Sequence, residues 1–276
     1  QYTDNNYTRS ARVGLLHNWT FRFSPSFVLE WKTLFNQLGN TQTIVRNGQF
    51  VIDGQDVQSY SQRFENRSIL TSQVSGEHTL SELTKATWYA SYGYSGRWEP
   101  DWKRARYIRT QGAVGPDGQP EPFGLVLPQQ PDPINAGRFY SKLNEHVGSL
   151  IGNIERILGN PTDREPSRIK AGFYTERRQR DFSARFYGYE GVGGVREIAT
   201  LPIGQAFAPE NVVGREGSLT LEDGTVGIDS YQGSTTYLAA YVSGDFYFGP
   251  KANLTVGFRG ESFNQTLRSA PRRVME

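Results

Sequence analysis

Apolar and polar residues alternate with a period of two along most of this chain. From position 11 to 23 the odd positions are Ala11, Val13, Leu15, His17, Trp19, Phe21 and Phe23, and the even positions are Arg12, Gly14, Leu16, Asn18, Thr20 and Arg22. Successive side chains of a β-strand point to opposite faces, so this stretch predicts a strand with one apolar and one mostly polar face.

The same alternation recurs and predicts an all-β chain of eight antiparallel strands in meander order. A turn at Ser24-Pro25-Ser26 ends the first strand, because Ser and Pro favour tight turns. The expected strands cover about 11–23, 27 to beyond 36, 58–76, 85–98, 137–158, 168–189, 230–248 and 251–267. At roughly 13–20 residues each they are much longer than the five or six residues usual in soluble sheets.

Two of these strands need separate comment. Leu143, Val147 and Leu150 belong to a set with helical spacing, but strands are expected on both sides, so 137–158 is also predicted as a strand. In 168–189 the apolar positions change parity between Phe173 and Phe182. Because a slip of one residue reverses the faces of a strand, this change predicts a β-bulge near 177–181.

The connections alternate in length, and this pattern favours a transmembrane β-barrel. Short connections are expected at 24–26, 77–84, 159–167 and 249–250, and long ones at 47–57, 99–136 and 190–229. Outer-membrane barrels have short periplasmic turns and long extracellular loops. Aromatic residues also gather near the strand ends, as in the girdles of such barrels: Trp19, Phe21, Phe23, Phe246, Tyr247 and Phe248 at one side, Trp98 and Trp102 at the other.

Composition narrows the classes of function. The chain has 30 Lys+Arg and 28 Asp+Glu, a net charge of +2, which argues against a nucleic-acid partner. There is no Cys, which excludes disulfides, thiolate metal sites and a cysteine nucleophile. The mean hydropathy is −0.59 and no apolar run is long enough for a transmembrane helix. A β-barrel is compatible with the low mean hydropathy and with the lack of a long apolar run, because its apolar residues alternate with polar ones.

Several segments resemble the barrel of TonB-dependent outer-membrane receptors of the Bacteroidota kind. They are Asn18-Trp19, Phe35-Asn36-Gln37-Leu38-Gly39, Arg46-Asn47-Gly48, Arg67-Ser68-Ile69, Gly76-Glu77-His78, Pro100-Asp101, Arg104, Arg180-Asp181-Phe182-Ser183-Ala184-Arg185 and Gly257-Phe258-Arg259. The resemblance implies uptake of a scarce large solute, of the siderophore, glycan or peptide class, across the cell outer membrane. It implies no enzymatic activity and no cofactor.

Receptors of this family have a plug, a TonB box and a barrel of about 22 strands. Residues 1–276 match only part of the barrel domain, and the end of the chain, 271–276, lacks the aromatic C-terminal strand of the family. We therefore expect an internal slice of the barrel, cut in two extracellular loops. By the resemblance, its partners are outer-membrane lipid and the TonB system, reached through the missing plug, with a surface lipoprotein as a further candidate.

The expected loops and lumen supply the candidate site residues. Loop 99–136 is rich in Pro and aromatic residues, so Trp102, Tyr107 and Phe123 are candidate solute contacts, because aromatic faces stack on sugars and flat ligands. The expected lumen-lining charges are Arg63, Glu65, Arg67, Arg259 and Glu261, together with Glu145, Glu176 and Arg178. They are expected chiefly to pair with one another, as barrel interiors are polar in general.

Other motifs favour less specific roles. The histidines His17, His78 and His146 are too far apart in sequence for close ligand pairs, so no metal site is predicted, and His78 is assigned to a periplasmic turn. The Gly191-Val192-Gly193-Gly194 cluster lacks the strand and helix of a phosphate loop, so a flexible loop is expected.

Three alternatives to the receptor remain open at this stage. The first is a passive porin or a biogenesis barrel of the same architecture. The second is a secreted all-β carbohydrate-binding or adhesin module. The third is a complete barrel of eight strands, although loops of nearly 40 residues are long for so small a barrel.

Overall fold

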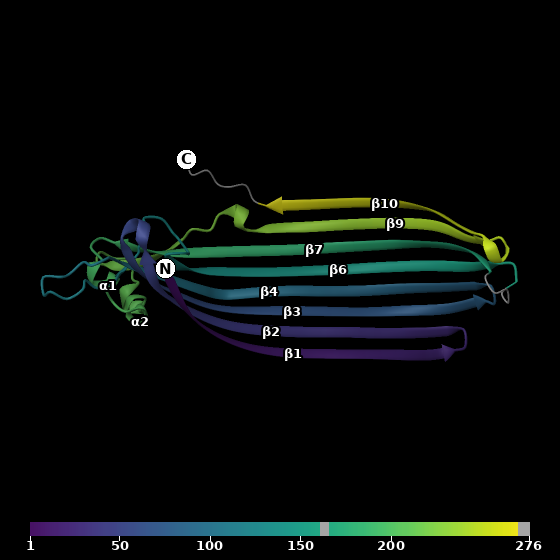
Figure 1. The fold of residues 1–276 in the computed structure, drawn as a ribbon, viewed down its shortest axis with the longest axis horizontal. Helices are drawn as coiled ribbons and strands as arrows, with labels where there is room; N and C mark the ends of the chain where they lie inside the picture. The colour runs from purple at the N-terminus through teal and green to yellow at the C-terminus, as the bar shows by residue number, and fades with distance from the viewer. Residues whose placement is uncertain (161–165, 270–276) are drawn as a thin grey trace.

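One large antiparallel sheet dominates the computed structural model, which describes residues 1–160 and 166–269 (Figure 1). Its strands are β1 (Tyr2–Ser24), β2 (Phe27–Phe50), β3 (Gln55–Ser81), β4 (Thr84–Thr110), β5 (Gly124–Leu125), β6 (Ala136–Leu158), β7 (Ser167–Val192), β8 (Ser218–Asp223), β9 (Tyr231–Tyr247) and β10 (Asn253–Ser269). Eight of them follow one another as neighbours in the order β1-β2-β3-β4-β6-β7-β9-β10, with β5 paired to β4 and β8 to β7. The predicted all-β meander is therefore confirmed.

Helical structure is confined to short segments. They are α1 (Arg196–Ala199), α2 (Ile203–Ala206) and the 3₁₀ turns η1 (Val51–Asp53), η2 (Pro209–Asn211), η3 (Gly227–Asp229) and η4 (Gly249–Lys251). Both α-helices lie at the end of the sheet that also holds the N-terminus and the end of β10 (Figure 1). We call this the loop side and the opposite end the turn side.

The fifth expected strand is confirmed as β6, despite its helical spacing. It pairs with β4 on one side and with β7 on the other along nearly its whole length. Leu143 and Val147 lie on one face of the sheet and Leu150 on the other, as the registers to β7 show. The backbone N–H and C=O groups of this segment are hydrogen-bonded on both edges by the neighbouring strands. This tertiary pairing outweighs the local helical spacing of its apolar residues.

The prediction of a long loop at 47–57 is wrong. The β2–β3 register runs without interruption to the pair Phe50↔Gln55, so the connection is a four-residue turn. Gly54 closes it with a φ of 61°, a left-handed conformation that glycine adopts without a steric penalty. Long and short connections thus alternate less regularly than predicted.

The other two long connections are shorter than expected and contain their own structure. β4 continues to Thr110, so its loop covers 111–135 and includes β5, and Trp102 and Tyr107 lie in a strand. β7 continues to Val192, and the segment 193–230 contains α1, α2 and β8. His78, expected in a turn, lies in β3 opposite Phe27. The end of the chain at 271–276 lies outside the described residues.

The prediction of a β-bulge near 177–181 is also wrong. The registers of β7 to β6 and to β9 run straight through this region. The apolar positions change parity because the surroundings change. Phe182 packs against Tyr231, with ring centroids 5.4 Å apart, and Ala184 is buried under the segment before β9.

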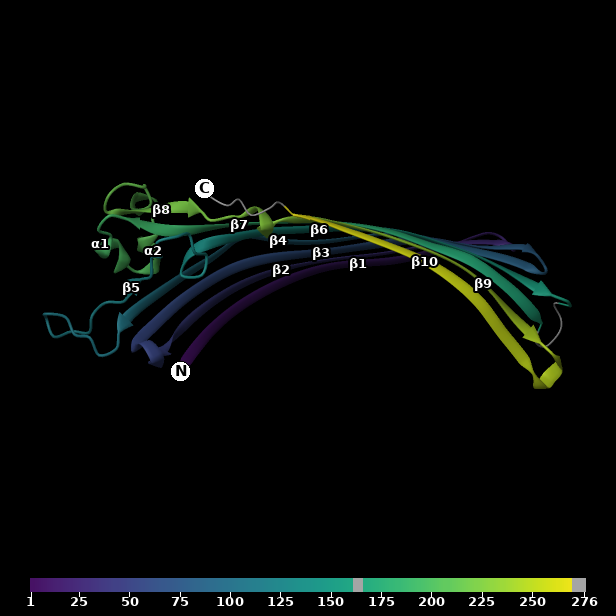
Figure 2. The same ribbon diagram turned by 90° about the horizontal axis from the view of Figure 1, so that it is seen from above.

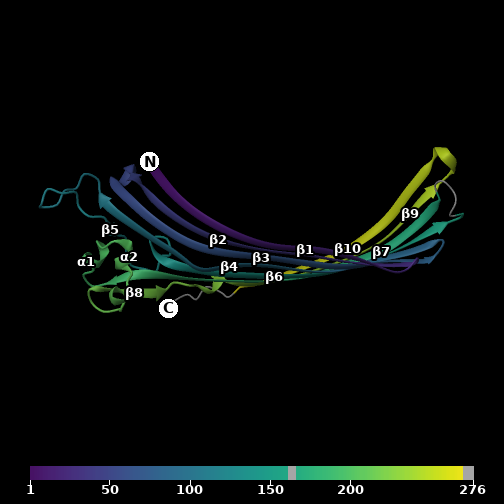
Figure 3. The same ribbon diagram turned by 90° about the horizontal axis from the view of Figure 1, so that it is seen from below.

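The described sheet is not closed. β1 and β10 are its two edges, and nearly every residue of both strands is exposed. Seen from above, the sheet is arched along its strands (Figure 2), and seen from below its two edges rise at opposite ends (Figure 3). The arch and the twist follow the right-handed twist of β-strands.

Candidate functional site

The two faces of the sheet differ sharply in chemistry. Paired residues of neighbouring strands share a face, so the registers assign each side chain. One face carries, on its turn-side half, the apolar band: Val13, Leu15, Trp19, Phe21, Phe23, Leu29, Trp31, Phe35, Leu70, Val74, Ala86, Trp88, Ala90, Tyr92, Tyr94, Leu150, Ile154, Ile169, Ala171, Phe173, Leu238, Ala240, Val242, Phe246, Leu254, Val256 and Phe258. Many of these side chains are exposed, and they come from all eight long strands.

Aromatic residues border the apolar band at both ends. At the turn side Phe23, Phe27 and His78 stack in a row, with centroid distances of 5.2 and 4.3 Å. At the loop side Tyr92 shares a hydrogen bond of 2.7 Å with His146 Nδ1, and Trp98 is half exposed. Rings with one polar and one apolar part suit the boundary between apolar and aqueous surroundings.

The opposite face, which we call the polar face, carries the expected lumen-lining charges. Arg63, Glu65 and Arg67 of β3 lie on it, as do Arg259 and Glu261 of β10. The latter two form an ion pair of 2.5 Å in which both side chains are about half exposed. Glu145 and Arg180 pair across β6 and β7 on the same face. These contacts match the structural pairing predicted from sequence.

Two buried carboxylates lie at the centre of a charge cluster on the polar face. Glu99 is 2% exposed; its Oε1 accepts a 2.5 Å bond from Arg63 Nε, and its Oε2 accepts a 2.9 Å bond from Ser141 Oγ. Arg97 Nη2 lies 3.1 Å from Glu99 Oε2. Such saturation of both oxygens offsets the cost of burying a charge.

Glu65 is the second buried carboxylate, at 6% exposure. It accepts hydrogen bonds of 2.6 Å from Arg67 and 2.5 Å from Arg97. Burial opposes the charged form of Glu65, but the guanidinium groups outweigh it, and the pKa of Glu65 lies below its ordinary value. The cluster therefore joins β3 and β4 through charged groups just beyond the apolar band.

Trp102 lies beside this cluster, on the polar face. Its Nε1 donates a 2.8 Å hydrogen bond to Ser61 Oγ, and the guanidinium carbons of Arg63 and Arg104 lie 4.9 and 3.5 Å from the ring centroids. A β-bulge between Glu99 and Trp102 shifts the register of β4 against both neighbours. It turns Trp102 onto the polar face, which regular alternation from Trp98 does not do.

Arg104 gives this part of the polar face a surplus of positive charge. Its Nε is buried and has no hydrogen-bond partner within the described part of the chain, and the same holds for Arg106. Burial lowers the pKa of Arg104, and the nearby charge of Arg63 lowers it further. The carboxylates of Asp132 and Glu99 act in the opposite direction and offset part of this lowering.

Tyr107 and Phe123 lie apart from Trp102, on the face that carries the apolar band. Tyr107 is 4% exposed and donates a 3.2 Å hydrogen bond to the carbonyl of Leu201, and burial raises its pKa to about 12. Phe123 lies under the guanidinium of Arg109, 4.5 Å from the ring centroid. The three predicted contact residues are therefore not brought together, and Tyr107 belongs to a small core with Ala105, Leu125 and Ala136.

Sequence reasoning missed two members of the charge cluster, the buried Glu99 and its partner Arg97. Arg97 and Glu99 stand two residues apart, with the spacing of Arg63, Glu65 and Arg67 on the neighbouring strand. That repeated alternation of charge is a signal from which their cross-strand pairing can be predicted. Arg104 carries no comparable signal, because its face depends on the bulge.

The histidines lie in three separate surroundings. His17 meets the ring of Trp31 edge-on at 4.8 Å, and His78 Nε2 accepts a 3.1 Å hydrogen bond from Trp88. Over residues 1–160 and 166–269 no group of three His, Asp or Glu side chains has the geometry of a metal site. Within the same ranges no helix has the length and apolar character needed to cross a membrane.

No protein-family model, curated protein or solved structure matches the chain. The site is thus defined by the geometry of the sheet alone.

Proposed function

We propose that this chain forms part of the wall of a transmembrane β-barrel in the outer membrane of a Gram-negative bacterium. The observation that carries the proposal is the apolar band, which occupies one face of all eight long strands while charged residues occupy the other. Lipid contact explains why so many large apolar side chains are exposed on that face.

The open edges support a wall that continues into further strands. Within residues 1–160 and 166–269, β1 and β10 each present an unpaired row of backbone groups. Unpaired N–H and C=O groups cost several kcal/mol each in hydrocarbon, so in a membrane these edges must pair with other strands. The charges of the polar face then line an aqueous lumen.

Strand length favours a receptor over a small pore. β3 and β4 have 27 residues each, whereas about 9–11 tilted residues cross the hydrocarbon core. The apolar band lies on the turn-side half, so the loop-side halves project out of the membrane with the segments 111–135 and 193–230. A projecting vestibule of this kind suits capture of a large solute.

In the proposed activity the chain contributes wall, lumen and vestibule to TonB-dependent uptake. Trp102, whose rings lie close to the guanidinium groups of Arg63 and Arg104, is the aromatic contact that the polar face offers to a solute. The unpartnered Nε of Arg104 suits a solute or plug segment with an anionic group. The plug and the link to TonB come from the resemblance of the barrel segments to that family.

A pair of neighbouring residues tests the membrane assignment. Leu150 and Ile151 of β6 are both aliphatic and lie on the apolar-band face and the polar face, respectively. Residues 1–276 contain no cysteine, so in a background without other cysteines Leu150→Cys and Ile151→Cys each introduce one site for a nitroxide label. In the complete encoded protein in lipid vesicles, the label at 150 should be relaxed by oxygen and not by an aqueous nickel complex, and the label at 151 should respond in the opposite way.

Equal access of the nickel complex to both labels would contradict the membrane assignment. It would favour the secreted all-β module instead. Conductance then separates the two kinds of barrel. A receptor whose lumen is filled by a plug should show no steady conductance in planar bilayers, whereas a passive porin should conduct ions at once.

A further inference from the structure

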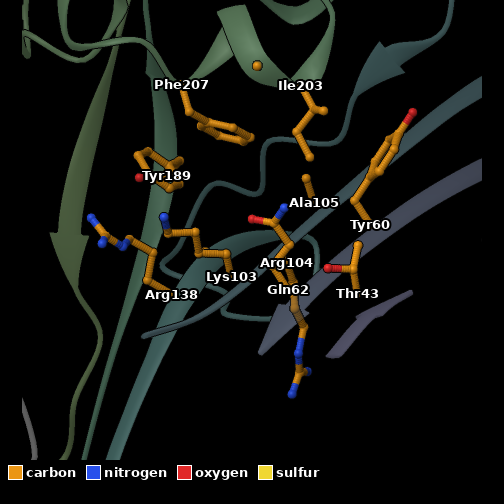
Figure 4. Close-up of a pocket in the computed structure, with 12 residues that line it drawn as sticks. Thr43, Tyr60, Gln62, Lys103, Arg104, Ala105, Arg138, Tyr189, Ile203 and Phe207 are labelled. Carbon is orange, nitrogen blue, oxygen red and sulfur yellow. The ribbon is translucent and has the colours of Figure 1, made fainter. Parts of the chain in front are cut away.

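A cavity of about 320 Å³ lies between the loop-side end of the sheet and the segment around α2. Phe207 and Ile203 reach into it from that segment, and Lys103, Arg138 and Tyr189 lie across from them (Figure 4). The remaining lining residues are Thr43, Tyr60, Gln62, Arg104, Ala105, Gly137 and Gly204. The side chain of Arg104 points away from the cavity toward the polar face (Figure 4).

The registers place this cavity on the face of the apolar band, beyond its loop-side limit. Tyr60 pairs with Ala105, and Arg138 pairs with Lys103, so these four residues share one face. The same face continues along β6 from Arg138 to Leu150. The bulge in β4 is the reason that Lys103 points here, because it reverses the alternation of all later residues of that strand.

Three aromatic side chains, Tyr60, Tyr189 and Phe207, line the cavity. The rings of Tyr189 and Phe207 lie 4.5 Å apart, and Tyr60 meets Tyr107 edge-on at 6.0 Å. These rings are held by the small core beneath α2, so their positions are fixed before a ligand arrives. Rigid aromatic faces stack on the C–H groups of a sugar ring.

Two cations that line the cavity, Arg138 and Lys103, share one carboxylate. Arg138 holds both oxygens of Asp101, at 2.9 and 2.5 Å, and Lys103 Nζ lies 3.4 Å from Asp101 Oδ2. The bidentate pair fixes Arg138 and leaves one positive charge in excess. Lys103 is 55% exposed, so it is the cation available to a ligand.

We propose that this cavity binds one sugar ring bearing a phosphate or carboxylate group. Ligand cavities of about 300 Å³ are at the small end of the usual range, which suits a single ring with its substituent. Tyr189, Phe207 and Tyr60 hold the ring, and Lys103 receives the anion. A glycolipid of the outer leaflet and a free acidic saccharide share this chemistry, and only the glycolipid source rests on the proposed membrane position.

Isothermal titration of the complete encoded protein in detergent micelles tests the site, with glucose 6-phosphate and glucuronic acid as probes and glucose as the neutral analogue. The wild type should bind the anionic probes at least about tenfold more tightly than glucose, and Lys103→Gln should abolish that preference. Lys142→Gln removes an exposed lysine on the same face outside the cavity and should keep it. Phe207→Ala should weaken the binding of all three sugars.

Equal affinity for glucose and glucose 6-phosphate, or an unchanged preference in Lys103→Gln, would overturn the proposal. Mass spectrometry of the purified protein then distinguishes the sources. A phosphorylated glycolipid retained by the wild type and lost in Lys103→Gln identifies the outer leaflet; sugar binding without a retained lipid identifies a free saccharide. The titration in micelles tests the sugar site, and the nitroxide labels at 150 and 151 test the membrane assignment. Because the two experiments are independent, failure of one proposal can be told from failure of the other.

Discussion

Trp98 and Trp102 are four residues apart on β4 and lie on opposite faces of the sheet. Trp98 pairs with Asn66 and Lys142 on the face of the apolar band, and Trp102 donates to Ser61 on the polar face. In a regular strand residues four apart share a face. The bulge between Glu99 and Trp102 breaks that rule, and it divides β4 into a half next to the apolar band and a half that carries the vestibule contacts.

Removal of the Glu99 charge should destabilise the protein more than removal of an exposed charge. Glu99→Gln leaves Arg63 and Arg97 without one of their carboxylates, and we expect a loss of about 3 kcal/mol in the free energy of unfolding, measured with urea in micelles. Glu30→Gln is the control, since Glu30 pairs with Lys32 at an exposed position and should cost less than about 1 kcal/mol. Equal losses would show that the cluster contributes no more than a surface ion pair.

Acid should remove the stabilisation that Glu65 provides. Its pKa is lower in the folded state, so the unfolded chain binds more protons near the ordinary glutamate pKa of about 4.3. The contribution is fully present above that value and is lost as the pH falls through the folded pKa. The difference in unfolding free energy between wild type and Glu65→Gln should therefore shrink from about pH 7 to pH 3. A constant difference over this range would contradict the ion-pair role.

Gly188 should be required for docking of the segment 111–135. A Cβ built there would lie 2.4 Å from the backbone at Pro131 and Asp132, which cannot move aside as a flexible side chain can. Gly188→Ala should free the segment and raise its rate of limited proteolysis about tenfold. Gly148→Ala is the control, since a Cβ there meets no atom within 4 Å and should leave the rate unchanged.

The hydroxyl of Tyr107 should stabilise the segment around α1 and α2. Tyr107→Phe removes its hydrogen bond to the carbonyl of Leu201, at an expected cost of about 1 kcal/mol. Amide hydrogen exchange over 196–207 should accelerate about fivefold. Tyr7→Phe alters an exposed phenol of β1 and should have no effect there. Unchanged exchange in Tyr107→Phe would show that packing alone holds the segment.

The sequence by itself determined the fold class and the chemistry of the two faces. Alternation of apolar and polar residues is a local property of each strand, so Leu15 and Arg12 revealed their faces without any neighbour. The charges Arg63, Glu65 and Arg67 were predicted on the polar face for the same reason. Turn chemistry at Pro25 and Ser26 likewise acts within a few residues.

Only the tertiary structure decided where alternation fails and which distant groups meet. The bulge in β4 depends on register against β3 and β6, and it alone sends Trp102 and Arg104 to one face and Lys103 and Tyr107 to the other. In β7 the apolar positions change parity without any bulge, because the register runs straight through. Phe182 is apolar on the polar face since it packs on Tyr231 there. Register and packing join residues far apart in the chain, and a pattern read along one strand does not contain them.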